Sequence, residues 1–236
     1  MFKKILRISL YIVLSIIGIL LVSFVALKVI YNEEFPQGEK GAPADELAQQ
    51  MLGAIKHEEF TQAKEIHWEF RGVNRYKWKL QEDMVEVFWK DYHVELQTKN
   101  PKKSKVYQND KEIEGDERKE AIAYATKNFN NDSFWLIAPH KVLDEGVERQ
   151  AIEKGNKQKL LVTYTSGGST PGDSYLWELD ENYMPISMKM WVSILPFDGV
   201  EAKWVDWQMT PGGFPLPQQR TFFGVEIPIS DVEVLR

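Results

Sequence analysis

The chain has 236 residues, a formal net charge of −6 and no cysteine. The absence of cysteine excludes disulfide bonds, thiol catalysis and metal sites built on thiolate ligands. The acidic charge disfavours a nucleic-acid partner, because affinity for phosphate depends on lysine and arginine. Aromatic residues make up 12% of the chain, enough to build a hydrophobic core, so we expect a folded domain.

The N-terminal segment differs from the rest of the chain in charge. Residues 1–31 hold four of the 29 basic residues and none of the 35 acidic ones, which leaves 25 basic and 35 acidic residues, a net charge of −10, in residues 32–236. Residues 8–27 are uncharged and mostly apolar, long enough to cross a bilayer as a helix. A cleaved signal peptide is the alternative, but its apolar region is shorter and ends in a small-x-small site, which residues 23–26 lack. We therefore predict an uncleaved anchor.

The charges that flank this anchor predict its orientation. Lys3, Lys4 and Arg7 precede it, and Glu33 and Glu34 follow it. Basic residues favour the cytoplasmic side of a membrane span. We predict a single-pass protein of the inner (cytoplasmic) membrane, with its N-terminus in the cytoplasm and its domain in the periplasm.

Composition divides the chain into three parts. Residues 1–31 are the predicted cytoplasmic stub and anchor. Residues 32–43 contain two prolines and two glycines among polar residues, which is typical of a linker. Residues 44–236 are the predicted domain.

Within the domain, hydrophobic periodicity predicts two helices and many strands. Apolar residues recur at helical spacing over residues 44–60 and again over residues 116–128. Alternation of apolar and polar residues predicts strands elsewhere, the clearest being a hairpin with its turn at residues 72–74. The predicted strands are 67–71, 75–80, 84–90, 92–98, 105–109, 147–153, 158–165, 174–180, 185–193, 200–210, 218–225 and a last one that ends near residue 234.

Several of these strands carry large apolar residues on both faces. Met84 and Phe88 alternate with Val85, Val87 and Trp89. A sheet with one wet face would alternate cleanly between apolar and polar residues, so both faces are expected to be covered. Two helices cover only one face, so the sheet must curl on itself. We predict a mainly β, α+β fold: a curved antiparallel half-barrel covered by about two helices, following the transmembrane helix.

Residues 131–147 lie between the second helical pattern and the long run of strands. They include Phe134, Trp135 and Leu136 in a row, followed by Pro139. We interpret this segment as the place where a covering helix is pinned onto the sheet.

No catalytic or metal-binding constellation is predicted. His67 with Glu69 and His93 with Glu95 each put an imidazole and a carboxylate on one strand face, but alternation turns both pairs outward, and we interpret them as exposed strand residues. The small-residue segment 167–173 precedes a strand, whereas a phosphate cradle needs a helix N-terminus. We therefore predict no enzyme activity, no metal and no cofactor.

Large apolar side chains are better candidates for a binding site. A subset of them is expected to line an apolar cavity, and the alternative is an ordinary core. The cavity candidates are Trp68, Phe88, Trp89, Phe134, Trp135, Tyr175, Trp177, Met190 and Trp207.

A family resemblance rests on two stretches of the chain. The first comprises residues 131–136 (Asn-Asp-Ser-Phe-Trp-Leu), Pro139, Lys141, Asp144, Gly146 and Val147, and the second comprises residues 170–173 (Thr-Pro-Gly-Asp) and Tyr175. Over roughly residues 60–210 the chain resembles an uncharacterised bacterial envelope family with the fold of the lipoprotein carrier LolA. The resemblance implies a curved antiparallel half-barrel around an apolar hollow, and it supplies no catalytic set. A soluble carrier is released after signal cleavage, whereas this chain is predicted to stay anchored, which favours local handling over shuttling.

These observations lead to two functional hypotheses. The first is a membrane-tethered, extracytoplasmic binding module for a lipid or a lipoprotein acyl chain. The second is a structural or protein–protein interaction domain of an envelope complex without a small ligand. The expected partners are the membrane and a lipid or lipoprotein, and not nucleic acid. A connected apolar hollow distinguishes the first from the second.

Overall fold

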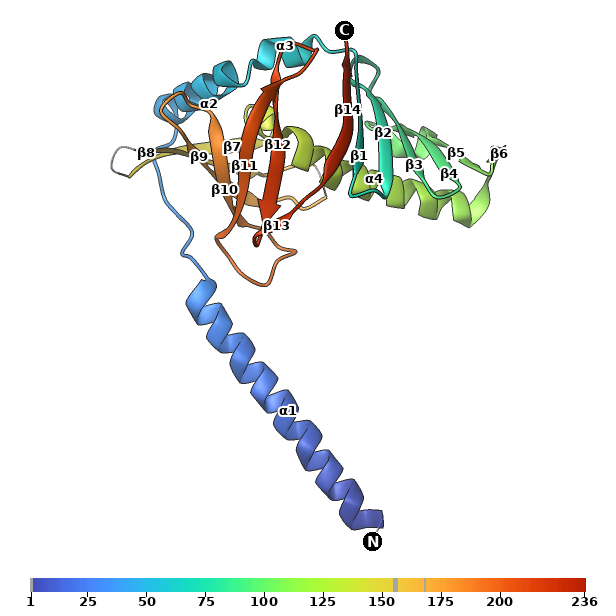
Figure 1. The fold of residues 1–236 in the computed structure, drawn as a ribbon, viewed down its shortest axis with the longest axis vertical. Coiled ribbons are helices and arrows are strands. Elements are labelled where there is room, and N and C mark those ends of the chain that lie inside the picture. Colours follow the sequence, from blue (N-terminus) through green and yellow to red (C-terminus); the bar gives the residue numbers. More distant parts are fainter. Residues whose placement is uncertain (1, 155–156, 168) are drawn as a thin grey trace.

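The computed structural model describes residues 2–154, 157–167 and 169–236. Gly168, in the small-residue segment 167–173, lies outside them. A long N-terminal helix, α1 (Phe2–Tyr31), projects away from a domain of helices and antiparallel strands (Figure 1). The predicted α+β class, with an apolar helix ahead of antiparallel strands, is confirmed.

Within the described residues the strands form two seven-stranded sheets, in which neighbouring strands pair antiparallel. We call the sheet of order β14-β1-β2-β3-β4-β5-β6 the first sheet, and the sheet of order β13-β12-β11-β10-β9-β8-β7 the second sheet. Alternation along the chain predicted the strands but not this division into two sheets. The C-terminal strand β14 forms one edge of the first sheet and pairs with β1, through partners such as Ile66 and Val234.

The first sheet comprises β1 (Glu65–Phe70), β2 (Asn74–Lys79), β3 (Met84–Trp89), β4 (Tyr92–Gln97), β5 (Lys105–Gln108), β6 (Lys111–Glu112) and β14 (Ile229–Leu235). The second comprises β7 (Val147–Lys154), β8 (Lys157–Tyr164), β9 (Ser174–Leu179), β10 (Pro185–Trp191), β11 (Val200–Met209), β12 (Pro215–Phe222) and β13 (Val225–Glu226). Short 3-10 turns occupy Leu80–Glu82, Pro101–Lys103 and Ala138–Lys141.

Two long helices cover the sheets. Helix α2 (Ala42–Ala54) packs against β7 and β8 of the second sheet, and α4 (Gly115–Ile137) packs against β4 and β5 of the first and reaches β12. The helix predicted over residues 44–60 is divided, because Lys56 adopts a left-handed backbone (φ 52°) before the short α3 (His57–Thr61). Residues on both sides of the break stay buried, including Leu52 and Phe60.

Helix α4 is longer than predicted and runs into the segment 131–147. The cluster of asparagines at positions 128, 130 and 131 favours a helix end on propensity alone. Phe129, Leu136 and Ile137 are nevertheless buried at helical spacing, and burial of an apolar face outweighs a weak propensity. The prediction that a helix stops near residue 128 is therefore wrong, and Phe134 and Trp135 lie on its last turns.

The two sheets enclose two hydrophobic clusters. The first core lies under the first sheet and includes Trp68, Trp89, Phe129 and Leu136. The second core lies under the second sheet and includes Trp177, Met188, Met190 and Trp204. Strand β12 contributes to both, since Leu216 packs in the first core whereas Phe222 packs against the second.

Helix α1 contains a 23-residue stretch, Ser9–Tyr31, that is long and apolar enough to cross a membrane and is not buried by the domain. The linker that follows is bonded to the second sheet. Glu33 pairs with Lys189, Asn32 bonds to Asp198, and Glu39 forms a backbone bridge with Ala151 of β7. The bridge covers the β7 edge, which would otherwise expose unpaired backbone groups.

Candidate ligand-binding site

Aromatic side chains gather on the inner face of the second sheet. Trp177 and Trp204 are buried and meet edge to face, with ring centroids 5.2 Å apart. Around them lie partly buried rings from four different strands and from the end of α4. These half-buried rings are Phe134, Trp135, Tyr164, Tyr175, Trp207 and Phe222. The face therefore combines a buried aromatic centre with a rim that solvent still reaches.

The last turns of α4 bring two of these rings into place. Successive residues on a helix point in different directions, about 100° apart. Leu136 accordingly packs in the first core, Phe134 packs against the second, and Trp135 contacts both. The Phe134 ring lies 4.6 Å from that of Tyr175, and the Trp135 ring lies 6.1 Å from that of Phe222. Trp135 thus lies on the boundary between the two cores.

Several polar atoms in this region lack a hydrogen-bond partner among the described residues. They are the Tyr164 hydroxyl, Nε1 of Trp177 and Trp204, and Nε and one terminal nitrogen of Arg220. All of these groups can donate, and the indole and guanidinium nitrogens can only donate. Trp207 differs, because its Nε1 donates to the carbonyl of Pro185 at 3.0 Å. A buried donor without an acceptor costs free energy, so the second core is chemically suited to a group that supplies acceptors.

Arg220 is the charged member of this set. Its side chain is 2% exposed, and its guanidinium carbon lies 5.5 Å from the centre of the Trp204 ring. The two residues face each other across the β11–β12 ladder. The cation–π contact offsets only part of the desolvation, and burial lowers the pKa of Arg220 to about 9.

The first core contains a polar network whose members bond to one another, while Nε1 of Trp68 in the same core has no partner among the described residues. Buried Asp132 accepts hydrogen bonds from the Tyr76 hydroxyl and from Nδ2 of Asn74 at 3.0 Å. Tyr124 in turn donates to Asn74 at 3.1 Å. Burial raises the pKa of Asp132, and the hydrogen bonds from Tyr76, Asn131 and Asn74 oppose that rise. The network ties α4 to β2, and its bonds are all used inside the protein.

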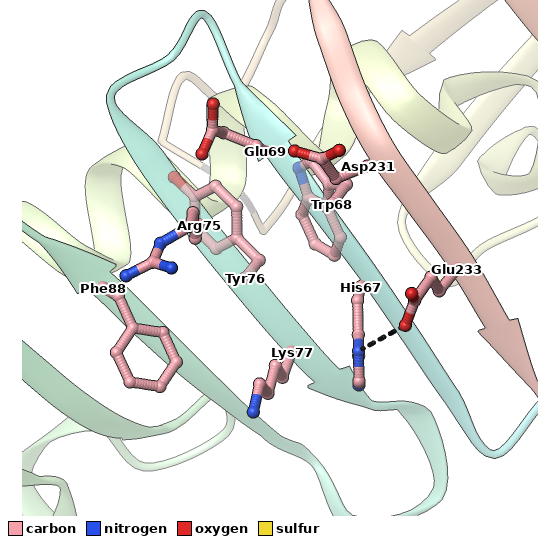
Figure 2. Close-up of a pocket in the computed structure, with 9 residues that line it drawn as sticks. All are labelled: His67, Trp68, Glu69, Arg75, Tyr76, Lys77, Phe88, Asp231 and Glu233. Atoms are coloured by element: carbon pink, nitrogen blue, oxygen red, sulfur yellow. Dashed lines mark ion pairs between the residues drawn. The ribbon is translucent and has the colours of Figure 1, made fainter.

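The outer face of the first sheet carries a shallow hollow of about 280 Å³ (Figure 2). Charged side chains of both signs surround it, among them Glu69, Arg75, Lys77 and Asp231. His67 lies between two carboxylates, 3.0 Å from Glu65 and 3.5 Å from Glu233. These charged groups distinguish the hollow from the aromatic face of the second sheet. Among the residues that the structure describes, no group of three His, Asp or Glu is arranged to hold a metal ion.

The structure separates the nine cavity candidates into three places. Six of them lie in or against the second core: Phe134, Trp135, Tyr175, Trp177, Met190 and Trp207. Trp68 and Trp89 lie in the first core, where they stack on Tyr76 and Tyr124. Phe88 lies on the outer face, stacked on His93 at 4.4 Å and lining the charged hollow. The assignment of these residues to a ligand site stays a prediction.

Sequence reasoning left four residues of the second core out of that set: Tyr164, Trp204, Arg220 and Phe222. Alternation could have found two of them. Arg220 and Phe222 are two residues apart on one strand and therefore share a face, which placed a guanidinium next to an aromatic ring. No pattern in the sequence predicts that these two residues lie close to Trp135, which is on a helix about 90 residues earlier in the chain.

The chain was compared with known proteins. No family model and no curated protein matches it. Solved structures similar to it include a DUF1329 family protein from Desulfovibrio piger, at 8% identity and a TM-score of 0.42, covering 82% of this chain and 94% of that one. Another is an outer membrane lipoprotein-sorting protein domain from Vibrio parahaemolyticus, at 11% identity and a TM-score of 0.39, covering 79% of this chain and 93% of that one. At these identities and scores neither likeness decides what this chain binds.

Proposed function

We propose that the chain is a membrane-tethered binding module that holds the acyl chain of a lipid or lipoprotein against the inner face of the second sheet. The observation that carries this proposal is the rim of half-buried aromatic rings on that face, above an apolar centre with unpartnered donors. Acyl-chain sites are lined mostly by apolar and aromatic side chains with a few polar groups that fix orientation. The inner face of the second sheet has both the apolar and aromatic lining and a few polar groups.

The position of α1 relative to the second sheet supports a site that opens at the membrane. Phe197, in the loop between β10 and β11, packs against Phe24 and Tyr31 of α1, with ring centroids 6.1 and 6.3 Å apart. Phe24 lies seven residues before Tyr31, roughly 10 Å along the helix axis. Once the helix spans a bilayer, a loop in contact with Phe24 reaches the bilayer surface.

Exposed apolar residues mark the same end of the sheet. Ile194, in the β10–β11 loop, is 70% exposed, and Phe223 and Val225, after β12, are 61% and 64% exposed. The pairing of Ala202 with Phe222 places this loop and this turn at one end of the sheet (Figure 1). Apolar side chains at a membrane-facing end are stabilised by the headgroup boundary.

The flanking charges complete the proposal. Lys3, Lys4 and Arg7 favour a cytoplasmic N-terminus, so residues 1–31 form the stub and anchor of a single-pass inner-membrane protein. Residues 32–43 form the linker and residues 44–236 the periplasmic domain. The tether makes the module act locally at the membrane.

Photo-crosslinking tests the site directly. The full chain, reconstituted in phosphatidylcholine nanodiscs, receives a trace of phospholipid with a diazirine in its acyl chain, and labelled peptides are located by mass spectrometry. We expect labels on the peptides that contain Phe134, Tyr175 and Trp207, beside unavoidable labels on α1. Trp207→Ala should reduce the domain labels several-fold, whereas Phe88→Ala on the outer face should leave them unchanged. Labels confined to α1 and the β10–β11 loop would rule out an acyl-chain site and favour an interaction domain.

A further inference from the structure

The second core contains a cation without a counter-charge. Arg220 is almost completely buried, and Nε and one terminal nitrogen have no hydrogen-bond partner among the described residues. Its Nε and terminal nitrogens form a planar fork that matches the two oxygens of a carboxylate or phosphate. In this structure the guanidinium carbon lies 5.5 Å from the centre of the buried Trp204 ring of the second core.

The electrostatics of the site agree with this geometry. Desolvation is the cause of the lowered pKa of Arg220, and no carboxylate of the described residues contributes to it. At about 9 the pKa still leaves the side chain protonated at neutral pH. A buried charge without a partner is strongly unfavourable, whereas a charge-assisted hydrogen bond from an anion removes that cost. Anion binding therefore offsets a cost that is already present in the fold.

The location of Arg220 suits the polar end of an amphiphile. It lies two residues before Phe222, near the end of the second sheet that carries the exposed apolar residues. Phe222 and Trp135, both half-buried, are ring neighbours 6.1 Å apart at this place. The indole Nε1 groups of Trp177 and Trp204 add two more donors in the same core.

We propose that Arg220 binds the anionic headgroup of the amphiphile, a carboxylate or a phosphate, while the apolar chain contacts the aromatic rings of the second core. This inference rests on the proposed function and adds the charge of the ligand to it. A neutral amphiphile of the same chain length gains the apolar contacts but not the charge-assisted hydrogen bonds.

The test uses three photoreactive probes with one chain length: a fatty acid, a phosphatidic acid and a fatty alcohol. The full chain is held in a maltoside detergent, which contributes no anion, and labelling of the peptides that contain Trp135 and Phe222 is quantified. For the wild-type chain we expect about tenfold more labelling by at least one anionic probe than by the alcohol. The ratio between the two anionic probes identifies carboxylate or phosphate as the preferred group.

Matched variants identify the residue responsible. Arg220→Met should remove the preference for the anion and keep labelling by the alcohol, and Arg220→Lys should keep part of the preference. Lys203→Met removes a cation from the exposed face of the neighbouring strand and should change nothing. A thermal shift of the wild-type chain by inorganic phosphate alone, absent in Arg220→Met, would identify a free anion as a sufficient ligand.

The outcomes separate the two proposals. Equal labelling by acid and alcohol, unchanged in Arg220→Met, would overturn the role of Arg220 and leave the acyl-chain site standing. Labelling of the second core by none of the three probes would overturn both.

Discussion

The two halves of the domain differ in how a buried ionisable side chain is bonded. In the first core, Asp132 is surrounded by donors from Tyr76, Asn74 and Asn131, so a buried carboxyl group is bonded within the protein. In the second core, Arg220 lies against the ring of Trp204, and its Nε and one terminal nitrogen find no acceptor among the described residues. The same chain thus contains one closed polar network and one open set of donors.

This difference assigns different roles to the two halves. A fully bonded network stabilises one arrangement, because breaking it leaves buried groups unpaired. An open set of donors stabilises the fold less and leaves interactions for a ligand. Under the proposed function, the first half, farther from α1 in Figure 1, is the scaffold, and the second half, adjacent to α1, is the binding part.

The largest effect is expected from breaking the closed network. Asp132→Ala removes the acceptor shared by Tyr76 and Asn74 and leaves the Tyr76 hydroxyl and Nδ2 of Asn74 without an acceptor in the core. We expect a loss of about 3 kcal/mol in the free energy of unfolding, measured by urea denaturation. Lys127→Ala, an exposed change on the same helix, is the control and should alter it by less than about 0.5 kcal/mol. A loss below about 1 kcal/mol for Asp132→Ala would mean that the network is not the scaffold.

In the second core a substitution is expected to raise the free energy of unfolding. Arg220→Met replaces a desolvated cation by an apolar side chain of similar length, and such replacements are often stabilising. Without a ligand we expect the variant to gain about 1–2 kcal/mol in the free energy of unfolding, seen as a higher Tm after delipidation. Destabilisation of the delipidated variant would show that Arg220 is satisfied within the fold, and the contrast between the two cores would fail.

The pH dependence of stability tests whether the buried side chain of His140 is neutral in the folded protein. His140 stacks on Phe60 at 4.2 Å, its Nδ1 lies 3.2 Å from Nδ1 of His57, and burial lowers its pKa well below 6.5. Folded His140 therefore stays neutral while the unfolded chain takes up a proton below pH 6.5. Stability should be complete above that pH and fall by up to about 1.4 kcal/mol per pH unit below it.

Denaturation at pH 7.5, 6.5 and 5.5 measures this slope, and His140→Gln should remove most of it. His57 contributes in the same direction, since burial lowers its pKa, although Asp144 and Glu58 partly oppose the shift. A wild-type stability that stays flat across this range would contradict a neutral, buried His140.

The smallest effect is expected on the outer face of the first sheet. Phe88 contacts His93 and lies below the charged groups of Arg75 and Lys77, 5.8 Å away. Phe88→Ala should cost less than about 1 kcal/mol, because exposed cation–π contacts are weak, and it should leave lipid labelling intact. A loss of labelling would move the ligand site to the hollow in Figure 2.

Local patterns predicted much of the scaffold. The hairpin of β1 and β2, with its turn at residues 71–73, follows from alternation, and the buried faces of Trp68 and Val87 follow from the same period. The end of α4 was missed because the three asparagines have low propensity, whereas burial of Leu136 and Ile137 decides the matter. That burial depends on the packed structure and is invisible in a local window.

The candidate site was predicted only in part. Six of the nine cavity candidates come together, because aromatic residues on neighbouring strands meet wherever alternation turns them inward. Phe88, Trp68 and Trp89 are separated from them by the division into two sheets, and alternation also turns Phe88 to the outer face of the first sheet. Two nitrogens of Arg220 lack acceptors because, among the described residues, no carboxylate or carbonyl is placed to accept from them in the packed structure. The sequence alone does not show which groups pack around a side chain.

The contacts of the linker have a consequence for how the protein meets its ligand. The linker after α1 is bonded through Asn32, Glu33 and Glu39 to β7, β10 and the β10–β11 loop. These bonds fix the orientation of the domain relative to α1. A freely swinging domain would sample the space above the bilayer in three dimensions. Under the proposed function, a fixed domain meets ligands that diffuse laterally in the leaflet, and its encounter rate depends on the lipid density in two dimensions and on the rotation of α1 about its own axis.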